Sequence, residues 1–147
     1  MILDSLLTLS DAQALTGTAV STNVADLSVG APQPRQIGEG EPLGILFTVD
    51  VAADVADGNE TYQFEIQTDD ASNFPSQATI AVRAIPRATL VAGYTFVLPI
   101  PMEAVEQFIR ANYTLGGTTP TITVTAQIQP LSMLARFVAY NDAITIS

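Results

Sequence analysis

The stretch that decides the fold is Thr121-Ile-Thr-Val-Thr-Ala-Gln-Ile-Gln129, in which apolar and polar side chains alternate without a break. Successive side chains of a β-strand point to opposite faces, so this alternation places one face in a core and the other in water. The run is also rich in β-branched residues, which favour strands. Residues 121–129 are therefore predicted to form a half-buried β-strand.

The same period of two recurs along the chain, and weaker strands are expected near residues 6–9, 24–29 and 143–146. No segment has a helical period, so an all-β protein is predicted, an antiparallel β-sandwich or a barrel. The five further alternating runs are 43–51, 61–68, 78–84, 93–98 and 108–115.

Turn residues separate these runs. The Asp57-Gly58 step favours a tight turn, and Asp69–Pro75 is a polar loop that ends in proline. Gly116–Pro120 is predicted to be a hairpin connection that pairs 108–115 with 121–129. Pro101–Gln107 is expected to form a turn or a single helical turn, because proline suits the first turn of a helix.

Two segments do not fit the regular pattern of the single domain predicted over residues 1–147. Residues 12–40 are rich in small residues and proline, and are expected to be an extended coil or arm that contacts the domain or a neighbour. Residues 131–147 form a C-terminal extension crowded with apolar side chains. This extension either returns as the last strand or lies as an arm on another subunit. The candidate interface residues in these two segments are Pro32, Pro34, Arg35, Met133, Phe137 and Tyr140.

The composition excludes several kinds of function. The chain of 147 residues has 15 acidic residues, five arginines, no lysine, histidine, cysteine or tryptophan, and a net charge of −10. It therefore lacks the residues of histidine-dependent nucleophilic sites and of ordinary zinc sites. So acidic a chain is a poor partner for nucleic acid. Without a basic N-terminal region or a long apolar run, neither a signal peptide nor a membrane span is expected.

Charged residues make up only 14 % of the chain, well below the usual quarter or so. Threonine, serine, asparagine and glutamine could cover the surface, but we favour the interpretation that other subunits bury part of it. The acids are then expected to crowd the loops that face water.

Acidic residues gather around the Asp57-Gly58 turn, which raises the question of a Ca²⁺ site. Their spacing does not follow the EF-hand pattern, because Val51 and Val55 stand where oxygen ligands are needed, so solvated loop carboxylates are the favoured interpretation. A glycosidase with paired carboxylates is the only enzyme class left open, and it is disfavoured. The acids concerned are Asp50, Asp54, Asp57, Glu60, Asp69 and Asp70.

The arginines have two interpretations. Arg87 is expected to pair locally with a carboxylate, as exposed arginines in an acidic chain readily do. Arg110 lies on the polar face of a predicted strand and is a candidate for a contact with another subunit.

Several short segments, in their order along the chain, resemble the small capsid cement (decoration) proteins of tailed bacteriophages. The resemblance covers residues 1–130 approximately. The segments are LSDAQALT (9–16), STNVADL (21–27), IGEGEPL (37–43), QTDD (67–70) before Phe74, LPIP (98–101) and FIRANY (108–113).

This resemblance implies a jellyroll, two antiparallel sheets packed face to face. It also implies a homotrimer on the outer surface of the virion, at threefold or quasi-threefold positions where it bridges major capsid subunits. The resemblance supplies no catalytic residue, metal or cofactor. The protein is expected to be made in the host cytoplasm. The alternatives are a carbohydrate- or receptor-binding jellyroll of a phage tail or surface structure, and a subunit of another shell or fibre.

Overall fold

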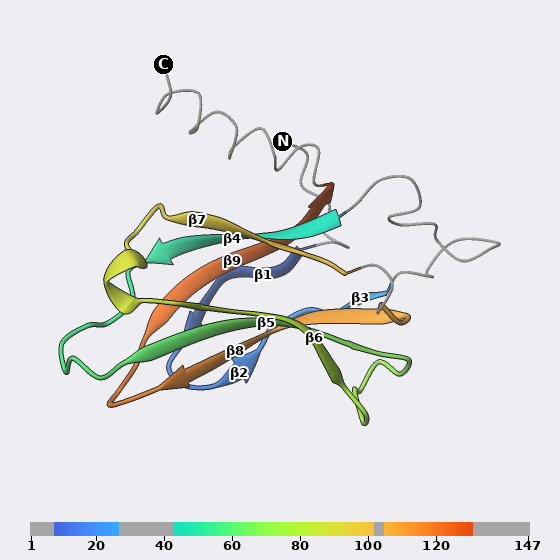
Figure 1. Ribbon diagram of the computed structural model, residues 1–147, viewed down its shortest axis with the longest axis horizontal. Coiled ribbons are helices and arrows are strands. Elements are labelled where there is room, and N and C mark those ends of the chain that lie inside the picture. The colour runs from blue at the N-terminus through green and yellow to red at the C-terminus, as the bar shows by residue number, and fades with distance from the viewer. Residues whose placement is uncertain (1–7, 27–42, 102–104, 131–147) are drawn as a thin grey trace, which may run out of the picture.

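The computed structural model describes residues 8–26, 43–101 and 105–130, and the strands in these ranges form a β-sandwich (Figure 1). The only helical segment among the described residues is a 3₁₀ turn at Arg87–Thr89. The strands are β1 (Thr8–Leu15), β2 (Ala19–Val20), β3 (Ala25–Asp26), β4 (Leu43–Val51), β5 (Thr61–Asp69), β6 (Ala78–Ile85), β7 (Thr95–Pro99), β8 (Phe108–Gly116) and β9 (Ile122–Pro130).

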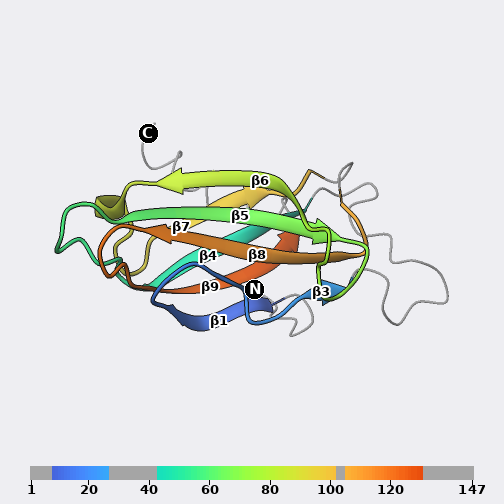
Figure 2. The same cartoon turned by 90° about the horizontal axis from the view of Figure 1, so that it is seen from below.

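The strands divide into two antiparallel sheets. One sheet has the order β1-β9-β4-β7; the other has the order β2-β8-β5-β6, with β3 also paired to β8. Figure 2 views the molecule from the side of the second sheet, with β6, β5 and β8 next to one another. Early strands pair with late ones, β1 with β9, β2 and β3 with β8, β4 with β7, and β5 with β6. This nested pairing is the topology of a jellyroll, and the predicted all-β sandwich is confirmed.

The predicted hairpin between 108–115 and 121–129 is wrong. Strand β8 pairs with β5, whereas β9 pairs with β4 and β1 in the opposite sheet. The connection at Gly116–Pro120 therefore crosses between the sheets, with Gly117 at a φ of +93°. Alternation shows that each strand has a buried face, but two such faces can meet across the core as well as side by side in one sheet.

The expected coil over 12–40 is also wrong in its first half. Residues 12–15 belong to β1, and β2 and β3 follow, while residues 27–40 lie outside the described part of the chain. The register of β1 against β9 shifts twice, and Ala12 has a φ of +48°. These bulges break the alternation along β1, and two-residue strands are too short to show a period.

The core lies between the sheets around four aromatic rings. Phe47 and Phe96 are stacked with ring centroids 4.9 Å apart, and Phe64 of the opposite sheet meets Phe96 edge-on, also at 4.9 Å. Tyr113 completes the group and shares a buried hydrogen bond of 2.8 Å with Ser10 of β1 in the other sheet. Aromatic contacts of this kind join the two sheets.

No helix in the described ranges is long and apolar enough to span a membrane. Pro101 and residues 105–107 are not helical, and residues 102–104 of the expected turn lie outside the description.

Candidate functional site

Arg110, the candidate interface residue of the predicted strands, lies on the outer face of the sheet formed by β8, β5 and β6. Its neighbours Ile109 and Ala111 point into the core, so the side chain of Arg110 points away from it. Its Nε donates a hydrogen bond of 2.8 Å to Oε1 of Gln67 on β5. Its guanidinium carbon lies 4.1 Å from the centroid of the Phe74 ring. Arg110 is thus held both by an acceptor and by an aromatic face.

The loop after β5 places Phe74 under the guanidinium. The carboxylate of Asp69 accepts the backbone N–H of Ala71 at 3.1 Å and that of Ser76 at 2.7 Å. The loop bends back, and Phe74, at a φ of +51°, becomes buried. Burial raises the pKa of Asp69, but these hydrogen bonds outweigh burial and hold the pKa below its usual value. The charged carboxylate thus organises the loop that supports Arg110.

Beside Arg110 the outer face of this sheet is a layer of polar side chains centred on Glu65. Oε2 of Glu65 accepts hydrogen bonds from Gln63 at 2.7 Å and Thr114 at 2.9 Å, and Oε1 accepts one from Asn112 at 3.1 Å. Burial raises the pKa of Glu65, but these donors outweigh it and the net shift is downward. This layer, called the Glu65 layer below, comprises Gln63, Glu65, Asn112 and Thr114.

Of the candidate interface residues, the structure places Arg110 and not the others. Pro32, Pro34, Arg35, Met133, Phe137 and Tyr140 all lie outside the described residues, as does the whole C-terminal extension.

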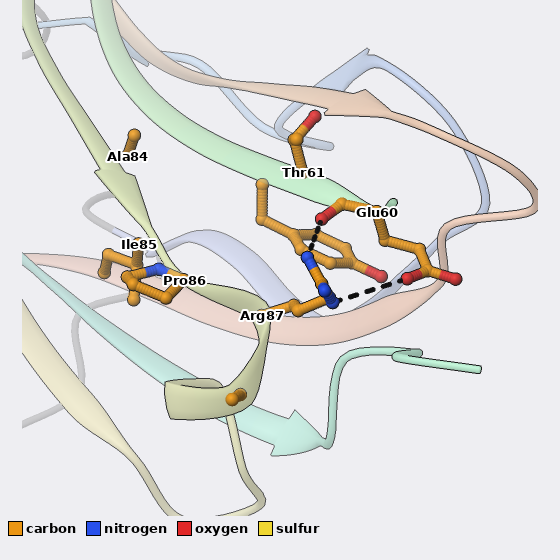
Figure 3. Close-up of a pocket in the computed structure, with 8 residues that line it drawn as sticks. Glu60, Thr61, Ala84, Ile85, Pro86 and Arg87 are labelled. Carbon is orange, nitrogen blue, oxygen red and sulfur yellow. Dashed lines mark hydrogen bonds and ion pairs between the residues drawn. The ribbon is translucent and has the colours of Figure 1, made fainter. Parts of the chain in front are cut away.

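A pocket of about 460 Å³ opens at the end of the sandwich, between the start of β5 and the end of β6. In Figure 3 the side chain of Arg87 points toward Glu60 at the mouth of this pocket. Nε of Arg87 lies 3.7 Å from Oε1 of Glu60, and Nη1 donates to the Glu60 carbonyl at 3.5 Å. The expected local pairing of Arg87 is confirmed. The pocket is lined by Glu60, Thr61, Tyr62, Ala84, Ile85, Pro86, Arg87 and Ala88.

Carboxylate oxygens of Asp54, Asp57 and Glu60 lie within 4.8 Å of one another. Glu60 accepts the backbone N–H groups of Asp57 and Gly58, Asp54 accepts that of Ala56, and Asp57 accepts the Thr119 hydroxyl. Burial raises the pKa of Glu60, but the backbone donors and Arg87 lower it further than burial raises it. Each of these carboxylates therefore has a donor within the protein.

The expectation that the acids crowd water-facing loops is wrong for three of them. Glu60, Glu65 and Asp69 are buried, and the last two lie within β5. Sequence reasoning missed Glu65 and Gln67 as partners of the site, although the alternation of 61–68 placed both on the polar face. No sequence pattern indicated that Phe74 belongs to the site, because its position depends on how the loop after β5 folds back.

The site as a whole presents groups that can bind a partner. It presents one guanidinium, whose planar donors match a carboxylate, beside amides and hydroxyls that already bond one another.

No curated protein matches this chain. The model of the Bbp16 family, a phage-related family, matches residues 9–128. This range runs from β1 into β9 and covers both sheets of the jellyroll. Because the match extends over most of its length, the chain belongs to the Bbp16 family.

Proposed function

We propose that this protein is a non-enzymatic capsid cement protein, which binds the outside of a tailed-phage head. As a homotrimer at threefold or quasi-threefold positions, it bridges major capsid subunits and stabilises the shell. It acts without a cofactor, and neither nucleic acid nor membrane is its partner. The family match over both sheets carries this proposal, since it joins a phage-related family to a jellyroll. The sequence resemblance to cement proteins adds to it.

The fold supports a mechanical role. The sheets are joined by aromatic contacts such as Phe47 with Phe64, and by the buried hydrogen bond between Ser10 and Tyr113. No buried side-chain polar atom in the described ranges lacks a hydrogen-bond partner. Such a module keeps its shape under load, because each displacement would break packed or hydrogen-bonded contacts.

A trimer at a threefold position would attach through three copies of the same modest contact. Once one subunit of a trimer has bound, the other two bind at a high effective concentration, so weak single contacts add up to stable attachment. The cores of protein interfaces are poor in charged residues, and a chain with only 14 % charged residues suits such repeated contacts.

Binding to undecorated heads tests the proposal. Heads assembled from the major capsid protein of the phage that encodes this chain would be mixed with the purified protein and sedimented. We expect saturable co-sedimentation and heads that withstand a higher temperature. Absence of binding at every protein concentration would contradict the proposal.

A further inference from the structure

The three arginines in the described part of the chain differ in what they bind. Arg87 lies beside the Glu60 carboxylate. Arg83 donates to the Val97 carbonyl at 3.4 Å and covers the Phe96 ring, so its guanidinium serves the sandwich itself. Arg110 has no carboxylate oxygen within ion-pair distance among the described residues, although the chain has three times as many acids as arginines.

Arg110 is nevertheless fixed in place. Its Nε is bound to Gln67 and its face rests on Phe74, while its two Nη atoms have no hydrogen-bond partner among the described residues. The charge of the Asp69 carboxylate acts on Arg110 through space, but the two oxygens of that carboxylate accept the N–H groups of Ala71 and Ser76. A guanidinium held in this way loses little conformational entropy when it binds a carboxylate through its Nη donors.

The surface around Arg110 is ordered as well. The Glu65 layer lies on the same face of the sheet, and each of its side chains is hydrogen-bonded to another member. A partner that docks here meets side chains that need not be reorganised, which lowers the entropic cost of association.

The chain itself supplies carboxylates that complement Arg110. Five acidic residues in the described ranges are exposed, and with a net charge of −10 each copy has far more carboxylates than its own arginines can bind. The low content of charged residues also indicates that copies cover part of one another's surface. The exposed acids are Asp11, Asp50, Asp57, Asp70 and Glu106.

We propose that Arg110 binds an exposed carboxylate of a second copy of this chain, with the Glu65 layer as the surrounding docking face. This inference rests on the homo-oligomer of the proposed function and deepens it, because it assigns a residue and a partner group to the contact between copies.

Association of the purified protein, followed by sedimentation equilibrium, tests this assignment. We expect Arg110→Gln to raise the dissociation constant of the oligomer about tenfold or more, with a smaller rise for Arg110→Lys, which keeps the charge but loses the planar donors. Arg83→Gln is the matched control: it removes a guanidinium that serves its own subunit, so association well below the melting temperature should not change. Circular dichroism would confirm that each variant is folded.

Salt gives a second measurement. Raising the ionic strength from ~0.1 M to ~1 M shortens the Debye length from about 10 Å to about 3 Å. Association of the wild-type protein should weaken with salt, and association of Arg110→Gln should weaken less. A wild-type protein that stays monomeric at ~100 μM, where even weak association is detectable, would overturn the assignment. A variant Arg110→Gln that associates like the wild type would overturn it too.

Binding to heads separates this inference from the proposed function. If Arg110→Gln assembles normally but loses binding to undecorated heads, the carboxylate belongs to the shell subunit, and the assignment to a second copy is wrong. If wild-type oligomers form through Arg110 but bind no head, the cement function fails and the contact between copies stands.

Discussion

Arg83 and Phe96 lie in different sheets, and the guanidinium carbon of Arg83 is 5.5 Å from the centroid of the Phe96 ring. Arg83 belongs to β6 and Phe96 to β7, the strands that end the two sheets on the same side of the sandwich. Nη1 of Arg83 also donates to the carbonyl of Val97 at 3.4 Å. This side chain therefore ties the two sheets together and shields the aromatic core from water.

Replacing Arg83 with alanine should destabilise the fold by about 1 kcal/mol, because a cation–π contact and the packing of the aliphatic stem are both lost. Urea unfolding measures the change. Arg83→Met keeps most of the stem and should lose about half as much. Equal stability of wild type and both variants would show that the contact of Arg83 with β7 does not stabilise the packing of the two sheets.

Gly117 allows a separate test of how the loops meet at the end of the sandwich. A Cβ atom at this position would lie 2.5 Å from the carbonyl oxygen of Asn59, and the φ of Gly117 is +93°. Gly117→Ala should therefore cost more than about 2 kcal/mol, as strain and a clash with backbone add up.

Two other glycines separate the cost of the backbone conformation from the cost of the steric clash. Gly93 has a φ of +90° but open space around it, so Gly93→Ala should cost about 1 kcal/mol from the backbone alone. Gly17 has neither constraint, and Gly17→Ala should change stability by no more than about 0.5 kcal/mol. Thermal melts of the three variants should rank in this order. A Gly117→Ala variant as stable as Gly17→Ala would refute the close approach of the two loops.

Acid should destabilise the protein through its buried carboxylates. The pKa values of Glu60, Glu65 and Asp69 lie below their usual values of 4.5, 4.5 and 3.8. Groups with a lowered folded-state pKa contribute stability above the unfolded pKa and lose it as the pH falls through the folded one. The unfolding free energy should therefore hold from pH 7 to about 5 and fall below about 4.5.

The variant Glu65→Gln tests how much of this pH dependence comes from Glu65. The amide replaces one carboxylate oxygen with an NH₂ donor, which then faces either the donor of Asn112 or those of Gln63 and Thr114. Stability at pH 7 should therefore fall by about 1–3 kcal/mol. The decrease in stability on acidification should also be smaller than in wild type. Asp11→Asn, at an exposed position, is the control and should leave both unchanged. A wild-type protein that gains stability on acidification would show that these buried carboxylates do not stabilise the fold in their charged form.

The strands were largely predictable from the sequence, because burial on one face imposes a period of two. Runs such as 43–51 and 61–68 gave the bounds of β4 and β5 almost to the residue. Strand pairing was not predictable in the same way. The alternation in β8 and β9 is compatible with a hairpin and with a crossing between sheets, and only the packing of Tyr113 and Val124 on opposite sides of one core decides between them.

The candidate site was predictable only in part. Arg110 was a candidate because it lies on the polar face of a predicted strand. The excess of acids over arginines predicted that Arg87 would pair with a carboxylate. What fixes Arg110 could not be foreseen, since Gln67 and Phe74 reach it through strand register and a loop whose shape depends on hydrogen bonds to Asp69.

Calcium distinguishes the proposed function from a carbohydrate-binding jellyroll that uses the metal. The carboxylates of Asp54, Asp57 and Glu60 already accept hydrogen bonds within the protein. We therefore expect millimolar Ca²⁺, the range in which extracellular modules bind, to leave the melting temperature unchanged. A rise of several degrees that is reversed by a chelator and lost in Asp57→Asn would favour the carbohydrate-binding alternative.

The most direct test of the cement function is cryo-electron microscopy of undecorated heads incubated with the purified protein. A capsid cement protein should add density of three jellyroll subunits on the outer surface at threefold and quasi-threefold positions, each subunit bridging neighbouring capsid proteins. Heads that show no added density, or density confined to a tail or portal structure, would contradict the cement function.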